Sequence, residues 1–561
     1  MRVRYGLVLT AALVLQGPGA EGKRWWGHIE YLASDGLEGR DVGSPGFEKA
    51  ATYVEERFRE IGLKPGGVSG YRQPVKFEAR ALVPDQTKLT LVRNGEGQPL
   101  TPGDEATLSP RGELNGSVEA PMVFVGYGLS IPEAQWDDLA GLDLRGKIAV
   151  YVNAMPPVGV SDNVKSHVGS GAERWAGLRK AGAIGIATLP NPPLPAAATA
   201  GANANAAAPP AAEGTPSAAA PSAGRGTAPQ TPQPAMVLAD RDLQDQAGQV
   251  LSITITRRGA EKLLADSGHT IDELDRLVAD KKPLPRFPLP GTLRAHATVT
   301  RTPIDSENVI GIYVGSDSAL KNEYVVMSAH LDHLGIGRPV NGDNIYNGAM
   351  DDASGVASII EIARLMKESG AKLKRSVLFM AQTAEEKGLL GSKYFVAHPT
   401  VPFPGIVADI NLDMFLPLYS LQVLEVQGLA ESSLGETVRE AAKAQGVDVQ
   451  TDREPEQNRF IRSDQYSFIR RGIPALAFKF GYQNGSPEEK IRRAWVRDVY
   501  HKPNDDVTQP VDTDAAAKFD RVILGVLERV ADDPHRPAWN GDSFFRRFAT
   551  GRPANAGQAR F

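Results

Sequence analysis

Cysteine is absent from the 561 residues of this chain. Its absence excludes disulfide bonds, thiolate metal ligands and cysteine nucleophiles together. The chain also has no large excess of one charge, because its formal net charge is −5, and we therefore expect no nucleic-acid partner. Beyond the N-terminus, no segment approaches the roughly eighteen uninterrupted apolar residues that a membrane span needs. Any metal site in this protein must use nitrogen and oxygen ligands.

The first twenty residues have the three-part pattern of a secretory signal peptide. Two arginines precede an apolar run from Gly6 to Leu15, and small residues lie around Ala20. The run is too short to span a bilayer. A buried N-terminal strand is the alternative, but the pattern favours a signal peptide over residues 1–20. We therefore predict an exported protein, periplasmic or extracellular, with no membrane span in the mature chain.

From about Ser306 onward, strand-like runs alternate with helical segments. The apolar runs are NVIGIYVG, EYVVMSA, SVLFMAQ, GIVADINL and PALAFKF. Such alternation predicts an α/β fold with a mostly parallel mixed sheet sandwiched by helices. An earlier helical pattern over residues 50–61 has no core of its own, and we expect it to pack on this sheet. The last helix is predicted within residues 512–533.

The chain between these parts is rich in β-like runs and predicts an inserted module. We divide the sequence into an N-terminal part of the catalytic domain, a β-rich insert, the main catalytic domain and a C-terminal tail. The predicted ranges are 21–115, 116–262, 263–540 and 541–561. Within the insert, residues 191–235 are almost wholly Ala, Pro, Gly, Ser, Thr and Asn. This composition predicts a disordered surface loop, to which we assign no chemistry.

Imidazole and carboxylate side chains follow the predicted strands where each strand ends. Functional groups in open α/β sheets gather at these carboxyl ends. The candidates are His330, Asp332, His333, Asp351, Asp352, Glu385, Glu386, Asp413, His501 and Asp505. Each motif alone also fits an N-cap or a solvated helix start, but the set indicates a metal centre. A histidine–carboxylate cluster without sulfur suits zinc, with manganese or cobalt also compatible.

The segments HLDHLG, GAMDDASGVA, EEKGLLGS, NLDMF and YHKPND together resemble the co-catalytic di-zinc exopeptidase family. That family includes bacterial leucyl aminopeptidases, the aminopeptidase Y type and glutamate carboxypeptidases. The front segment YLASDGLEGRDVGSPGFEKAATYV is similar to the N-terminal part of the family's catalytic domain. The segments VFVGYG, LRGKIAV and AGAIGIA are similar to the protease-associated domain that is often inserted there. The resemblance covers most of the chain apart from the Ala/Pro-rich loop.

The resemblance implies two zinc ions per chain and assigns a role to each motif. The implied ligands are His330 and Asp413 on one ion, Glu386 and His501 on the other, and Asp351 bridging both. Glu385 falls at the position of the general base, Asp332 at that of an acid that orients the ligand histidine, and Tyr500 at that of an oxyanion donor. The peptide between Asp351 and Asp352 is expected to be cis, with Asp352 held by nearby donors and not by metal.

These roles imply an aminopeptidase that acts on peptides with a free N-terminus, through a metal-bridged water activated by a glutamate base. A carboxypeptidase of the glutamate carboxypeptidase type is the main alternative. A glutaminyl cyclase, which uses a single zinc, and a non-enzymatic receptor-like homologue are further alternatives, and the complete ligand set argues against both. The sequence leaves open the oligomeric state, the side-chain preference and the metal loaded in the cell.

Other charged residues receive simpler interpretations. Four arginines near SDQYSF could line a pocket for an acidic substrate, but no pattern places them on one side, so an exposed helix face is expected. They are Arg459, Arg462, Arg470 and Arg471. His333 is interpreted as a surface residue or a neighbour of the ligands, not as a further ligand. His28, His167 and His398 lie outside the strand-end motifs and are interpreted as structural.

Overall fold

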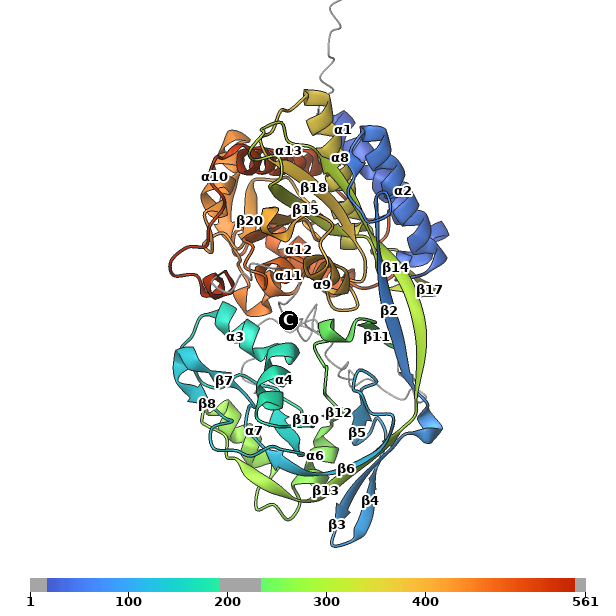
Figure 1. Cartoon of the computed structure of the whole chain (residues 1–561), viewed down its shortest axis with the longest axis vertical. Coiled ribbons are helices and arrows are strands. Elements are labelled where there is room, and N and C mark those ends of the chain that lie inside the picture. Colours follow the sequence, from blue (N-terminus) through green and yellow to red (C-terminus); the bar gives the residue numbers. More distant parts are fainter. Residues whose placement is uncertain (1–17, 192–233, 550–561) are drawn as a thin grey trace, which may run out of the picture.

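The computed structural model describes residues 18–191 and 234–549. The predicted signal peptide lies outside the described residues except for its last three, which begin helix α1 (Pro18–Leu32). The predicted Ala/Pro-rich loop also lies outside them, apart from its first residue and its last two. The chain forms two bodies stacked along the long axis of the molecule, with most of the helices in one of them (Figure 1).

The larger body is built on a ten-stranded mixed sheet with the order β11-β2-β14-β18-β15-β19-β22-β20-β21, and β1 pairs with β14. The bounds are β1 (Lys64–Pro65), β2 (Arg72–Leu82), β11 (Ala235–Leu238), β14 (Val299–Tyr313), β15 (Tyr324–His330), β18 (Ser376–Gln382), β19 (Ile406–Asn411), β20 (Val423–Gln427), β21 (Asp448–Thr451) and β22 (Ala475–Phe480). Strands β18, β15, β19 and β22 are mutually parallel. The outer strands pair antiparallel except β20 with β21, so the parallel part is concentrated at the centre.

Helices cover both faces of this sheet, as predicted. One face carries α1, α2 (Pro45–Ile61), α8 (Ser354–Ser369), α10 (Leu434–Ala444) and α13 (Thr513–Asp532), and the other carries α9 (Leu390–Ala397) and α11 (Gln465–Ile469). Along β15, Val325 and Met327 pack in the first core and Val326 in the second. This alternation follows from the two-residue period of a strand, and both faces are apolar because both are covered.

The smaller body is an eight-stranded sheet with the order β4-β3-β13-β6-β9-β10-β12-β5. The bounds are β3 (Lys88–Arg93), β4 (Glu96–Leu100), β5 (Ala106–Leu108), β6 (Gly116–Phe124), β9 (Ile148–Val152), β10 (Gly185–Leu189), β12 (Leu251–Ile255) and β13 (Phe287–Ala297). Helices α3 (Asp162–Gly169), α4 (Gly171–Lys180), α6 (Arg257–Leu264) and α7 (Ile271–Ala279) belong to it. The sheet extends beyond the predicted insert of 116–262 at both ends, because β13 pairs with both β3 and β6.

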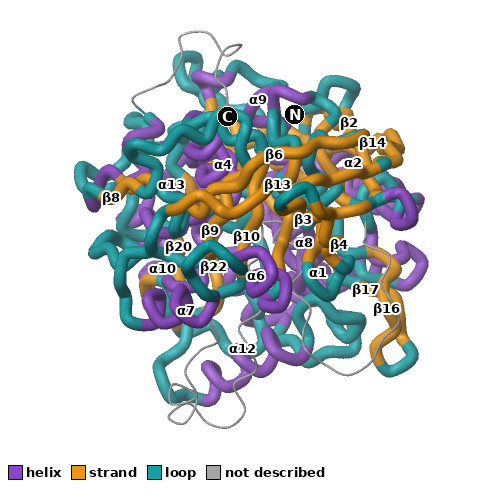
Figure 2. The backbone as a smooth tube through the Cα atoms, turned by 90° about the horizontal axis from the view of Figure 1, so that it is seen from below, coloured by secondary structure: helices purple, strands orange, loops and turns teal. Residues whose placement is uncertain are grey.

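The two bodies are connected by continuous antiparallel strands. Strand β2 leads towards β3, and β13 leads directly into β14, so the chain crosses twice along one side (Figure 1). Figure 2 shows β13 beside β6 when the molecule is seen from below. Arg470 donates to Glu173 at 2.6 Å, and His167 lies 2.5 Å from the Tyr466 hydroxyl. The insert is therefore held against α11 and its neighbours.

Within the described ranges, none of the helices combines the length and the apolar composition needed to cross a membrane.

Candidate metal centre

Three of the predicted site residues reach the same edge of the sheet because their strands are parallel. His330 is the last residue of β15, while Glu385 and Asp413 follow the ends of β18 and β19. The register aligns His330 with Gln382 at the end of β18. The carboxyl ends of neighbouring parallel strands therefore bring these side chains together, as the sequence predicts.

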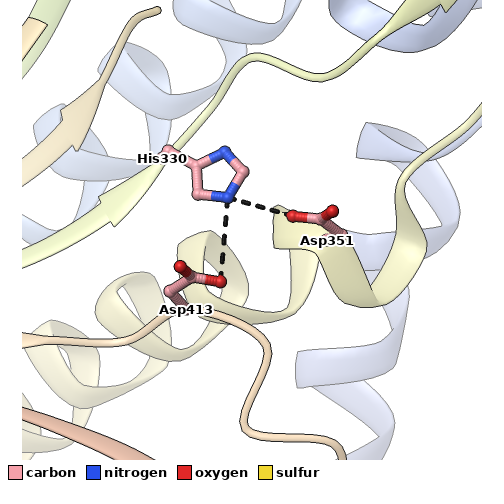
Figure 3. A group of neighbouring side chains, drawn as sticks. All are labelled: His330, Asp351 and Asp413. Carbon is pink, nitrogen blue, oxygen red and sulfur yellow. Dashed lines mark ion pairs between the residues drawn. The ribbon is translucent and has the colours of Figure 1, made fainter. Parts of the chain in front are cut away.

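His330, Asp351 and Asp413 form the first group of candidate ligands (Figure 3). The Nε2 atom of His330 lies 3.1 Å from Asp351 Oδ1 and 3.9 Å from Asp413 Oδ1. The other ring nitrogen, Nδ1, lies 3.0 Å from the carbonyl oxygen of Asp332. A carbonyl can only accept, so Nδ1 carries the proton and Nε2 presents its lone pair to the group.

A second group lies on the other side of Asp351. The Nε2 atom of His501 is 3.1 Å from Asp351 Oδ2 and 3.3 Å from Glu386 Oε2. Asp351 thus presents one carboxylate oxygen to each group, which is the geometry of a bridging ligand. All five predicted ligands are brought together at this edge.

His333 is completely buried in the second group, so of its two interpretations the surface residue is wrong and the neighbour of the ligands agrees with its position. Its Nδ1 atom lies 2.8 Å from Glu386 Oε1 and 3.8 Å from Asp351 Oδ2. Neither ring nitrogen makes a hydrogen bond within the described part of the chain. The sequence could have indicated this position, because His333 is the second histidine of HLDH and follows the predicted ligand His330 by three residues.

The donor atoms fit bound divalent cations. Asp351 Oδ2, Glu386 Oε1 and both nitrogens of His333 are buried and make no hydrogen bond to any described residue. Buried carboxylates and imidazoles without partners are costly unless a cation or a donor compensates them. A mixture of imidazole nitrogen and carboxylate oxygen without sulfur is a donor set that zinc accepts.

The adjacent aspartates in the bridge segment have separate tasks, and the peptide between them is cis, as expected. The carboxylate of Asp352 accepts backbone N–H groups of His330 at 3.2 Å, Gly355 at 3.0 Å and Met414 at 3.2 Å. The expectation that donors hold Asp352 is confirmed. A Cβ on Gly355 would lie 2.1 Å from Leu412 O, so this contact requires glycine.

Asp332 positions the two glutamates through its carboxylate. Its oxygens accept the backbone N–H groups of Glu385 at 3.0 Å and Glu386 at 3.3 Å. The Asp332 carboxylate was predicted to orient His330. In the structure, the backbone carbonyl of Asp332 does so instead. The side chain is turned towards the segment after β18, and burial raises its pKa to about 6.

Two further residues, Arg40 and Asp505, support the bridge segment. From the sequence, Asp505 was named only as a member of the candidate set, and Arg40 was not singled out. Arg40 is fully buried and donates to the carbonyl oxygens of Leu331, Asn347 and Gly348. Burial lowers its pKa to about 10, although nearby aspartates act in the opposite direction. Asp505 accepts the N–H of Asp351 at 3.1 Å. In the sequence, Arg40 lies in the segment GRDVGS and Asp505 in HKPND. Neither segment reveals that these side chains contact the backbone of the bridge segment.

Glu385 and Tyr500 lie beside the two groups. Burial raises the pKa of Glu385 well above its usual range; the nearby His330 lowers this pKa, and the negative charges of Asp413 and Glu386 raise it. No hydrogen bond or ion pair ties the carboxylate to another described residue, so its oxygens remain available. The Tyr500 ring stacks on the His501 ring with a centroid distance of 3.8 Å.

The four arginines near SDQYSF do not form an exposed helix face, so that expectation is wrong. Arg459 and Arg462 line a small cavity beside Met414. Arg470 pairs with Glu173, and Arg471 is buried over the ring of Phe403. The three other histidines lie outside the site and contact Tyr53, Tyr466 and Asp240 respectively.

Two ligand groups that share one aspartate, at the carboxyl edge of a helix-covered mixed sheet, define a candidate dinuclear metal centre. Residues 308–527 match the model of peptidase family M28. The match covers about two fifths of the chain, and in this part the chain is similar to the peptidases of family M28.

Individual relatives match part of the chain. It is 28% identical over 221 residues to a probable leucine aminopeptidase 2 of Aspergillus oryzae, covering 36% of this chain and 40% of the relative. It is 26% identical over 263 residues to leupeptin-inactivating enzyme 1 of Streptomyces exfoliatus, and this match covers 44% of this chain and 53% of the relative. It is 31% identical over 116 residues to carboxypeptidase Q of Xenopus laevis, and this match covers 20% of this chain and 22% of the relative. The matches thus span between about a fifth and about half of these relatives.

The solved aminopeptidase from Aneurinibacillus sp. strain AM-1 has the same overall fold. The TM-score is 0.51 at 20% sequence identity, and the alignment covers 92% of this chain and 95% of that structure. The structural similarity therefore includes both bodies of the chain, whereas the family model matches only residues 308–527.

Proposed function

We propose that the protein is an exported zinc-dependent aminopeptidase that removes N-terminal residues from peptides. The observation that carries this proposal is the placement of Asp351 between two ligand groups, with the uncoordinated Glu385 beside them. The relatives named leucine aminopeptidase support the direction of cleavage. Export rests on the N-terminal pattern in the sequence.

The proposal assigns His330, Asp351 and Asp413 to one zinc ion and Asp351, Glu386 and His501 to the other. The Nδ1 atom of His333 is a further donor next to Glu386. When bound, the ions supply a lowered pKa for a shared water and polarise the scissile carbonyl.

Glu385 acts as the general base and then as the general acid. Its carboxylate accepts the proton of the attacking water and returns it to the leaving amine. Burial and neighbouring negative charges raise its pKa, and cations at the two ligand groups would act in the opposite direction and favour the carboxylate that accepts the proton. Asp332 fixes the backbone on which Glu385 stands. The Tyr500 hydroxyl is assigned to the developing oxyanion.

The same proposal keeps a protease-associated insert between two catalytic parts, and the smaller sheet widens this insert from the predicted 116–262 to 88–297. The predicted signal peptide at 1–20 and C-terminal tail at 541–561 complete the division. The contacts of α3 and α4 with α11 and its flanking residues support a role of the insert in limiting access to the site.

A carboxypeptidase is the second candidate function, and the cationic cavity beside Met414 favours it, because a C-terminal carboxylate needs a cationic partner. The relative named carboxypeptidase Q gives the same indication. A glutaminyl cyclase or a receptor-like protein receives less support, because all five predicted ligand side chains lie together at this edge.

A panel of chromogenic peptides tests the proposal. The set contains aminoacyl substrates with a free amine, the same substrates with a blocked amine, and blocked peptides with a free C-terminus. An aminopeptidase cleaves only the first group. Cleavage of the blocked peptides at their C-terminal residue would establish the carboxypeptidase instead.

A further inference from the structure

A small cavity surrounded by cationic side chains lies next to the metal centre. Its volume is about 20 Å³, and its lining includes Met414, Arg459, Arg462, Lys479 and Arg492. This is room for about one water-sized atom, such as a single carboxylate oxygen, and it is too small for a leucine side chain. Four positive side chains around so small a space point to an anionic occupant.

The walls of the cavity belong to the segments that supply the candidate ligands. Met414 directly follows Asp413, and the Nζ atom of Lys479 on β22 donates to the Asp413 carbonyl oxygen at 2.7 Å. Arg492 lies on α12 (Pro487–Asp498), just before Tyr500 and His501. A substrate bound at the centre is therefore within reach of this cavity.

The guanidinium groups of Arg492 and Arg459 have carboxylate partners. Arg492 forms a buried bidentate pair with Glu425 at 3.0 and 3.2 Å. Arg459 pairs with Glu454 at 2.8 Å. These contacts neutralise much of the charge of both arginines and hold them in place.

Lys479 has no such partner. Its side chain is buried, with the residue 6% exposed, and its ammonium donates to a single carbonyl oxygen. No carboxylate of the described residues forms an ion pair with it within 4.0 Å. An ammonium has three donors, so two of them and the positive charge remain for an incoming group. A buried charge without a counter-charge is costly, and a bound anion removes that cost.

We propose that this cavity binds the side-chain carboxylate of an acidic N-terminal residue, so that the enzyme prefers peptides that begin with glutamate or aspartate. Lys479 is the group that recognises the charge. An apolar side chain placed here would leave Lys479 desolvated without a partner. This inference rests on the proposed aminopeptidase activity and adds its substrate class.

The test compares substrates with N-terminal glutamate and glutamine, which have nearly the same shape and differ in charge. Because the ratio of their kcat/KM values is taken within each variant, general damage to the enzyme cancels. The expected preference for glutamate is about tenfold or more, or about 1.4 kcal/mol. In K479M the ratio falls to near one. In K490M, which removes an exposed positive charge from the neighbouring helix α12, it stays at the wild-type value. Equal rates in the wild type, or an unchanged ratio in K479M, would overturn the proposal.

Two further arms separate this inference from the proposed function. Thermal shift with free L-glutamate and L-glutamine does not depend on turnover, and only L-glutamate should stabilise the zinc-loaded protein, an effect lost in K479M. N-blocked peptides with a free or an amidated C-terminus test whether the cavity binds a C-terminal carboxylate instead. If K479M changes only the preference for a free over an amidated C-terminus, both the N-terminal assignment and the aminopeptidase activity fail. If all free-amine substrates are cleaved equally well, the aminopeptidase stands and this inference fails.

Discussion

At the scale of single residues, the bridge segment shows how two adjacent carboxylates can be stable. Asp351 directs its two oxygens to two ligand groups, whereas Asp352 accepts three backbone N–H groups. The cost of burying Asp352 is thus offset by backbone donors, whereas the Asp351 oxygens face imidazole nitrogens and Oδ2 makes no hydrogen bond to a described residue. Cations bound at the two groups would offset the cost of burying Asp351.

Substitution of Glu385 by glutamine tests the assignment of the base. The amide has nearly the same shape but cannot accept the proton of the attacking water, so kcat should fall by about 10²- to 10⁴-fold. Because Glu385 is assigned to neither ligand group, two zinc ions per chain should remain, as measured by elemental analysis. Turnover at the wild-type rate would exclude Glu385 as the base.

Substitution of His333 by asparagine tests its place beside Glu386. Removal of a donor atom from the second group should weaken the binding of one of the two ions by about 10- to 100-fold, as loss of supporting contacts around a metal does. Competition with a chelator measures this affinity, and the absorption spectrum of the cobalt-loaded protein reports the change in ligands. His398→Asn is a matched control, because its side chain is 49% exposed and pairs with Asp240. Wild-type affinity for both ions in His333→Asn would show that His333 does not support the site.

At the scale of elements, the packing of α13 on α8 buries a carboxyl group in the core. Asp520 on α13 is 2% exposed, and burial raises its pKa well above the usual range, against a smaller opposite effect of the Ser358 hydroxyl. The folded protein therefore keeps a proton that the unfolded chain loses at its ordinary pKa. Stability falls as pH rises from that value, near 4, towards the raised pKa.

The variant Asp520→Asn removes this dependence. It should be more stable than the wild type at pH 8, and the difference should shrink as pH falls, with a slope of at most about 1.4 kcal/mol per pH unit. Urea unfolding of both proteins in the same series of buffers from pH 4 to 8 measures it. A difference that stays constant across the series would contradict the raised pKa.

At the scale of the whole molecule, metal should stabilise the fold as well as catalyse the reaction. A ligand that binds only the folded state at a thousand times its Kd contributes about 4.1 kcal/mol. Chelation should therefore lower the Tm and abolish peptidase activity, and zinc should restore both. Calorimetry and a peptidase assay on the same samples check this. A Tm and an activity that both ignore chelation would refute the metal centre.

The candidate site was more predictable than its surroundings. All five predicted ligands meet at one edge. His330, Glu386 and Asp413 do so because they lie at or after the ends of parallel buried strands that the sequence indicates. The support from Arg40 and the burial of His333 were not predictable, since they depend on contacts between segments far apart in the chain. The exposed helix face expected for Arg459 and Arg462 was wrong for the same reason, because their positions depend on contacts with distant segments.

The sequence by itself determined the chemistry: without cysteine, the histidines and acids at strand ends indicate a nitrogen–oxygen metal site, and the alternating apolar runs indicate a helix-covered sheet. Only the tertiary structure decided the extent of the second sheet, the carbonyl that orients His330 and the buried ammonium of Lys479 beside Asp413. Local patterns specify which elements form, because propensity and periodicity act over a few residues. Which side chains meet depends on pairings between distant strands, and these are set by the packing of the whole chain.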